Sequence, residues 1–172
     1  MPLRFPRPAM MPGALFLAVA CVASASSPAL ADQVRTQEWW LRALHVPQAW
    51  QVTQGAGVTI AVLDTGVNSQ QPDLRGSVLP GPDYTRSGET PASPFYAAHG
   101  TAVASLIAGH GHGGGARNSG IVGIAPAARI LPVRVTLDPA DPLLASSAGA
   151  AARPDAIASG IRYAVRQGAK VI

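Results

Sequence analysis

The sequence is poor in cysteine, in aromatic residues and in charge, and each shortage excludes a class of protein. Its 172 residues include one cysteine, Cys21, so a small fold held together by disulfides is excluded. Aromatic residues make up 5% and charged residues 13%, against 48% hydrophobic residues, which excludes an intrinsically disordered chain. Abundant alanine and 18 glycines favour close packing of helices on a sheet.

Runs of basic residues are lacking too. The formal net charge is +4, and two of the positive charges, Arg4 and Arg7, stand close to the N-terminus. A weak and scattered positive charge does not make the basic face that nucleic acids require. We therefore expect no nucleic-acid partner.

Residues 1–31 have the layout of a secretory signal peptide. Two arginines form a basic start, residues 13–22 are apolar but too few to span a bilayer, and Ala29-Leu30-Ala31 is a cleavage signal. We expect cleavage after Ala31, a secreted or cell-surface protein, and membrane association only through this segment or a C-terminal anchor beyond the chain. The alternatives are a membrane anchor, a buried core helix, or a lipid on Cys21.

The remaining chain alternates between strand and helix patterns. Residues 58–63 and 128–135 are apolar, β-branched runs typical of strands buried on both faces, although Pro132 leaves a weak or unpaired position. Residues 101–108 and 155–167 have helical spacing and end at glycines, residues 110–118 read as a loop, and Lys170 begins a further strand.

This order predicts an α/β fold with a doubly wound, mainly parallel sheet and helices on both faces. No linker marks a second domain. Because the chain stops within an expected buried strand, we expect a truncated sequence whose fold is incomplete at the C-terminus.

Two residues stand where α/β proteins build sites. Asp64 follows a buried strand at its carboxyl end, although an aspartate before Gly66 can also be a turn residue. His99 precedes the helix at 101–108, where the helix dipole disfavours the imidazolium, so we expect a neutral base. Taken alone, His99 could equally be a capping or loop residue.

With their neighbours, these residues resemble the subtilisin-like serine proteases, the subtilases of peptidase family S8. The matching segments run in the family's order: Ile60–Val67, Gln71–Leu74, His99–Ala104, Gly123–Ala128, Ile161–Ala164 and Ala169–Ile172. The resemblance covers about residues 40–172, which makes residues 32–172 the N-terminal part of a peptidase domain. The short leader is similar to that of bacterial subtilases related to the mycosins.

The resemblance implies a serine endopeptidase acting on proteins or peptides, with Asp64 as the orienting acid and His99 as the general base. The family's nucleophile stands in a Gly-Thr-Ser-Met-Ala turn that is absent here, and neither Ser105 nor Ser119 has such a context. We expect the serine and the oxyanion-hole asparagine to lie beyond Ile172, and this chain alone to be inactive. The alternative is a catalytically inactive, subtilase-like binding or scaffold module.

No cofactor is expected for catalysis. Asp73 matches an aspartate that binds structural Ca²⁺ in many subtilases, here with carbonyls around residues 118–122; the alternative is an exposed turn residue. Residues 109–114 fit the pattern G-x-G-x-x-G but follow a helix, so no dinucleotide is expected. His110 and His112 lack a third metal ligand nearby and are interpreted as part of a solvated loop.

Overall fold

The computed structural model describes residue 34 and residues 37–112, 119–145 and 154–172. Its elements, in chain order, are α2 (Trp39–Ala43), α3 (Val46–Ala49), β1 (Thr59–Asp64), the 3₁₀ turn η1 (Pro72–Leu74), α4 (Ala98–Ala108), β2 (His110–His112), β3 (Ser119–Val122), β4 (Arg129–Arg134), η3 (Pro142–Ala145) and α5 (Pro154–Arg166). The predicted signal peptide lies outside the described residues. Among the described helices, none combines the length and hydropathy of a membrane span.

Strands β1 and β4 lie side by side and parallel, with Thr59 opposite Arg129 and Asp64 opposite Arg134. Further parallel bridges extend this pair on both sides: Val171 pairs beside β1, and Val78 and Asp83 pair beside β4. Both predicted strands are confirmed to within one or two residues, and the predicted strand at Lys170 is present as the bridge at Val171.

Pro132 falls where the sheet can tolerate it. The amides of Ile130 and Arg134 point away from β1 and donate to the Ser77 and Pro82 carbonyls. Pro132 is the residue between them on that same side, and a proline has no N–H to donate. Gly81 lies close to this position, because an added Cβ on Gly81 would lie 1.6 Å from the Pro132 carbonyl oxygen. The predicted unpaired position is therefore confirmed.

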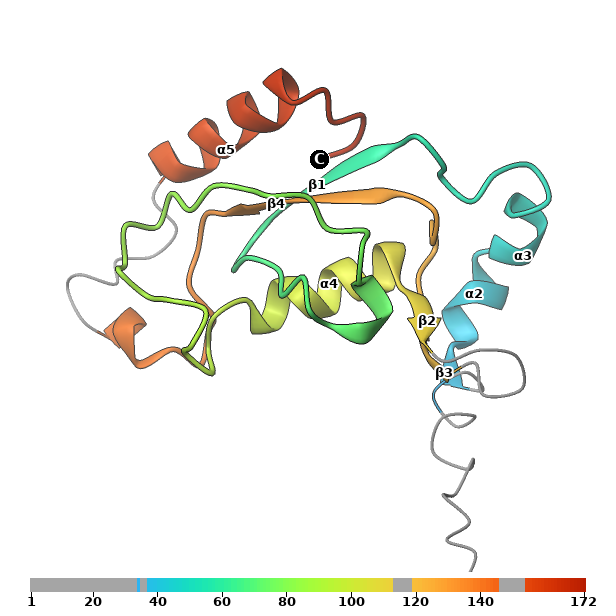
Figure 1. Cartoon of the computed structure of the whole chain (residues 1–172), viewed down its shortest axis with the longest axis horizontal. Helices are drawn as coiled ribbons and strands as arrows, with labels where there is room; N and C mark the ends of the chain where they lie inside the picture. The colour runs from blue at the N-terminus through green and yellow to red at the C-terminus, as the bar shows by residue number, and fades with distance from the viewer. Residues whose placement is uncertain (1–33, 35–36, 113–118, 146–153) are drawn as a thin grey trace, which may run out of the picture.

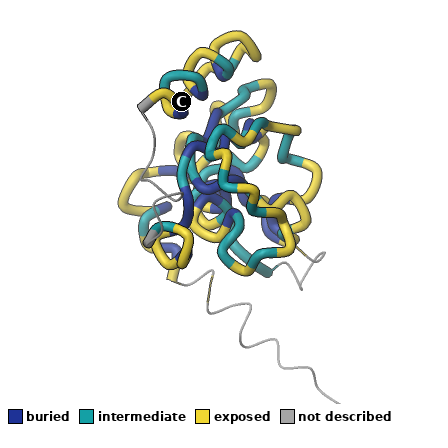
Figure 2. Tube along the Cα trace, turned by 90° about the vertical axis from the view of Figure 1, so that its left-hand side faces the viewer, coloured by how far each residue is buried: buried dark blue, intermediate teal, exposed yellow. Residues whose placement is uncertain are grey.

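Helices cover both faces of this sheet, as Figure 1 shows, with α5 on one side and α4 on the other. Alternate residues of the strands serve the two layers, because side chains along a strand point to opposite faces. One cluster comprises Ala61, Leu131, Val133 and Val135 packed with Ala156 and Ala164 of α5. The other comprises Val62 and Ile130 packed with Leu74 and with Ala104 and Ala108 of α4. Figure 2 shows the buried residues gathered in the interior of the tube. A parallel sheet with helices on both faces confirms the doubly wound α/β fold.

Two local predictions are wrong. Residues 110–112 form strand β2, which pairs antiparallel with β3, so they are not part of a loop. Short glycine-rich strands carry little propensity of their own, and this one is held by its partner. Helix α4 begins at Ala98, earlier than predicted, because its first amides are capped by side chains distant in sequence.

Candidate active site

Asp64 is the last residue of β1, and it lies on the face of the strand that packs against α4. Its side chain is only 16% exposed, and one of its oxygens accepts the Thr65 amide at 2.6 Å. Both carboxylate oxygens lie 2.9 Å from Nδ1 of His99. The structure thus brings together two residues that are 35 positions apart in the sequence.

His99 is the second residue of α4, and it presents its ring between the carboxylate and solvent. Nδ1 faces Asp64, while 58% of the side chain remains exposed. A carboxylate at Nδ1 places the neutral ring's proton there and leaves Nε2 as the basic nitrogen. The arrangement can therefore accept a proton on the solvent side and stabilise the resulting imidazolium.

The close approach of α4 to β1 depends on Gly100. An added Cβ on Gly100 would lie 2.1 Å from the Gly66 carbonyl oxygen and 3.2 Å from Oδ1 of Asp64. The Gly100 amide donates to Oγ1 of Thr65 at 2.9 Å. Asp64 therefore holds His99 through its imidazole, and Thr65 holds the next residue, Gly100, through its backbone amide.

The pKa of His99 is raised, first by the hydrogen bond to Asp64, then by the negative charge of Asp64, and to a smaller extent by Asp138. The helix start, on which the sequence-based expectation rested, disfavours the imidazolium, whereas the contact with Asp64 favours it and sets the upward direction. The carboxylate of Asp64 contacts the ring directly, and the charge of Asp138, which contacts the backbone amide of His99, acts in the same direction. His99 is a base that holds its proton more tightly than a free histidine does.

The sequence of this chain is similar to those of known proteins. The Subtilase family, Peptidase_S8, matches residues 55–172, which is more than half of the chain. The chain belongs to this family. It is 41% identical to thermitase from Thermoactinomyces vulgaris over 129 residues and 37% identical to fervidolysin from Fervidobacterium pennivorans over 145 residues. These alignments cover 75% and 82% of the chain but 40% and 20% of the relatives.

Solved structures agree with the sequence relatives. The crystal structure of MycP1 from Mycobacterium smegmatis superposes with a TM-score of 0.56 at 32% identity, covering 77% of this chain and 34% of that one. The subtilase fold is therefore shown, and mycosins are among the relatives. The chain spans well under half the length of each of these proteins.

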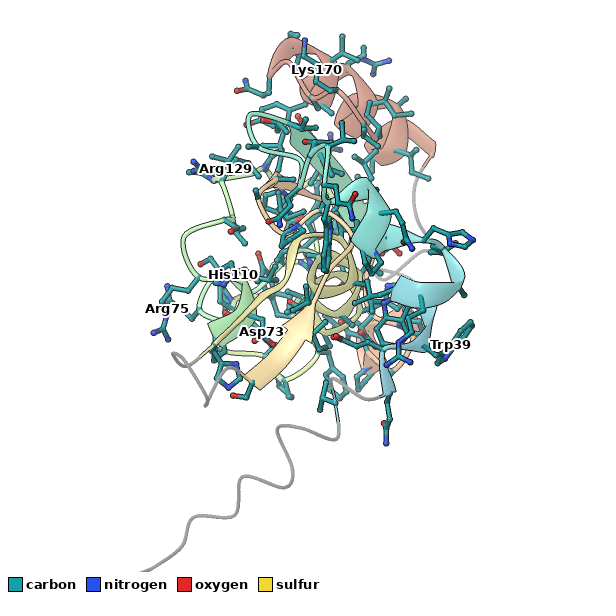
Figure 3. All side chains as sticks on the ribbon, turned by 90° about the vertical axis from the view of Figure 1, so that its right-hand side faces the viewer. Trp39, Asp73, Arg75, His110, Arg129 and Lys170 are labelled. Carbon is teal, nitrogen blue, oxygen red and sulfur yellow. The ribbon has the colours of Figure 1, made fainter. Side chains whose placement is uncertain are left out.

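In this subtilase, Asp73 lies against the β2–β3 sheet (Figure 3). Its carboxylate is 4% exposed and is approached by nitrogen atoms: Nδ1 of His112 at 2.6 Å, the Ile121 amide at 3.1 Å and the Gln71 side-chain amide at 3.2 Å.

Calcium requires six to eight oxygen ligands. No group of three acidic, histidine or cysteine side chains suited to a metal occurs among the described residues. The contacts of the Asp73 carboxylate come from nitrogen atoms, which are not calcium ligands, and residue 118 of the expected cage lies outside the described residues, so the calcium site stays a prediction. Asp73 is also buried, so the alternative of an exposed turn residue is wrong, and His112 is its partner.

Sequence reasoning missed Arg134, which contacts the residue that follows Asp64 and is 1% exposed. Its Nε donates to the Thr65 carbonyl at 2.9 Å, and its guanidinium lies 4.5 Å from the centre of the Tyr96 ring. It also forms ion pairs with Asp83, at 2.8 Å, and with Glu89. A single arginine in a strand pattern gave no signal of this role, because its acidic partners lie in a loop about fifty residues earlier in the sequence.

Proposed function

We propose that the complete protein containing this chain is a serine endopeptidase in which Asp64 is the orienting acid and His99 the general base. Membership of the subtilase family supports serine peptidase activity. The residue assignment is supported by the contact of Nδ1 of His99 with both oxygens of Asp64 at 2.9 Å. Peptides and proteins are the proposed substrates.

In the proposed mechanism, a serine Oγ forms a bond to the peptide carbonyl carbon while its proton passes to Nε2 of His99. His99 then gives this proton to the leaving amine nitrogen as the C–N bond breaks. Water repeats the sequence on the acyl-enzyme and releases the acid. Asp64 keeps the imidazole oriented and stabilises its cationic form throughout.

The serine is proposed to come from sequence that follows Ile172 in the complete protein. Ser105 is 2% exposed inside α4 and donates its hydroxyl to the Thr101 carbonyl, which is no position for a nucleophile. Ser119 lies in β3 and donates to the His112 carbonyl. We propose accordingly that residues 1–172 alone do not hydrolyse peptides.

We also propose that the protein is exported to the cell surface or medium. The support is the basic start, apolar stretch and Ala29-Leu30-Ala31 signal of residues 1–31. The relatives' names do not decide the compartment: one is an intracellular serine protease from Paenibacillus polymyxa, and another is MycP1 of a type VII secretion system. Amino-terminal sequencing of the protein recovered from the culture medium should begin at Asp32.

Covalent labelling tests the proposed chemistry. A fluorophosphonate probe phosphonylates only a serine activated by a neighbouring base. The complete protein should be labelled, the His99→Ala variant should not, and His110→Ala, an exposed histidine on β2, should be labelled normally. Equal labelling of the wild type and His99→Ala would exclude His99 as the base. No labelling of any of them would favour the catalytically inactive binding module.

A further inference from the structure

The amides at the start of α4 are capped by side chains that lie far away in the sequence. The N-cap residue Ala97 has no side-chain acceptor, so the helix cannot satisfy its own first amides. Gly100 donates to Thr65, as described above. The amide of His99 donates to Oδ2 of Asp138 at 3.2 Å.

Asp138 lies in the segment that follows β4, and its geometry is fixed from both sides. The residue is 9% exposed, and its other oxygen accepts the Ala140 amide at 3.0 Å. One carboxylate thus bridges its own turn and the backbone of the proposed base. Asp64 holds the ring of His99, and Asp138 holds its main chain.

We infer that Asp138 is a positioning residue for His99, fixing the backbone from which the imidazole reaches Asp64. The inference rests on the proposed function for its catalytic consequence, but the contact itself does not. Misplacing a reacting group by about 1 Å can lower a rate by on the order of a hundredfold, so a fixed backbone at His99 matters for catalysis.

Charge supports the same assignment. Asp138 raises the pKa of His99 after the two contributions of Asp64. Among the described residues, the charged groups that shift the pKa of His99 are Asp64 of β1 and Asp138 of the segment after β4. Arg134, which packs against the Thr65 carbonyl, is paired with Asp83 and Glu89.

The test compares Asp138→Asn and Asp138→Ala with a matched control, Asp141→Asn, in the complete protein. Asp141 is 4% exposed and accepts the Leu143 amide in the same kind of turn, but it makes no contact with His99. Two quantities are measured for each: the pKa of His99, from NMR titration of its ring protons, and kcat for peptide hydrolysis.

Asp138→Asn should lower the pKa of His99, because the carboxylate charge is gone while the shape is kept. Asp138→Ala should lower kcat by roughly ten- to a hundredfold. Asp141→Asn should change neither quantity. The inference is overturned if Asp138→Ala, which removes both the charge and the acceptor of the His99 amide, leaves the pKa of His99 at its wild-type value, or if Asp141→Asn lowers it equally. The titration needs no turnover, so it tests the role of Asp138 even in a protein that hydrolyses no peptide. The absence of hydrolysis would refute the proposed function separately.

Discussion

Replacing Arg134 by methionine should destabilise the protein by about 4 kcal/mol, because the change leaves an unpaired negative charge in the interior. Glu89 is 6% exposed, so loss of its partner corresponds to breaking a buried ion pair, which costs about 3–5 kcal/mol. The Thr65 carbonyl loses the Nε donor, which adds about 1–3 kcal/mol. Burial of the methionine side chain returns about 1.5–3 kcal/mol.

Asp83 contributes less to this loss, since its side chain is 34% exposed and its ion pair is screened by solvent. Burial alone would raise the pKa of Asp83, but hydrogen bonds from Thr85 and Arg134 outweigh it and lower the pKa. The contribution of Asp83 to the free energy of unfolding is therefore fully present above the ordinary aspartate pKa. It is lost as the pH falls through the lowered pKa of Asp83 in the folded protein. Arg134→Met should weaken this acid dependence.

The assay is urea denaturation of the complete protein in a His99→Ala background, which prevents self-digestion of unfolded molecules. Arg134→Met combined with Glu89→Gln should be more stable than Arg134→Met alone, because the second change removes the stranded charge. Arg134→Lys should lie between the wild type and Arg134→Met, since lysine keeps the charge but not the forked contacts. A loss below about 1 kcal/mol for Arg134→Met would refute the reasoning.

Three further predictions concern the site and its surroundings. Gly100→Ala should lower kcat/KM by at least about a hundredfold, since its Cβ would push α4 away from Asp64; peptide hydrolysis measures this, and unchanged activity would contradict the packing. Asp64→Asn should lower the pKa of His99, so that the acid limb of kcat/KM moves to lower pH; a limb that stays in place would contradict the assignment. EDTA should leave the melting temperature unchanged, whereas Asp73→Ala should lower the free energy of unfolding by about 1–3 kcal/mol, because the Ile121 amide loses its acceptor. A fall in melting temperature on adding the chelator would support a calcium site instead.

The contact between Asp64 and His99 could be anticipated because both residues stand at element boundaries that the local sequence marks. Asp64 ends an apolar, β-branched run, and His99 is the second residue of a helix of small residues. Both strands and α5 were predicted for the same reason, since buried parallel strands and amphipathic helices carry regular hydrophobic patterns.

The supporting contacts could not be predicted, because they join polar residues that no pattern links. Asp138 is 39 positions from His99, and Arg134 is 45 positions from Glu89. The raised pKa of His99 could not be predicted for the same reason: the helix start is visible in the sequence, but the distances from His99 to the carboxylates of Asp64 and Asp138 are not. Strand β2 was missed because its stability comes from β3 and from the contact between His112 and Asp73.

The central claim is that His99, oriented by Asp64, is the general base of a serine peptidase. The most direct measurement is kcat/KM for peptide hydrolysis by the complete wild-type protein and by its His99→Ala variant, with both proteins shown to be folded. We predict a loss of about 10⁴- to 10⁶-fold, the scale on which removing a triad member lowers the rate in serine proteases, subtilisin included. Equal activity of the two proteins would contradict the claim.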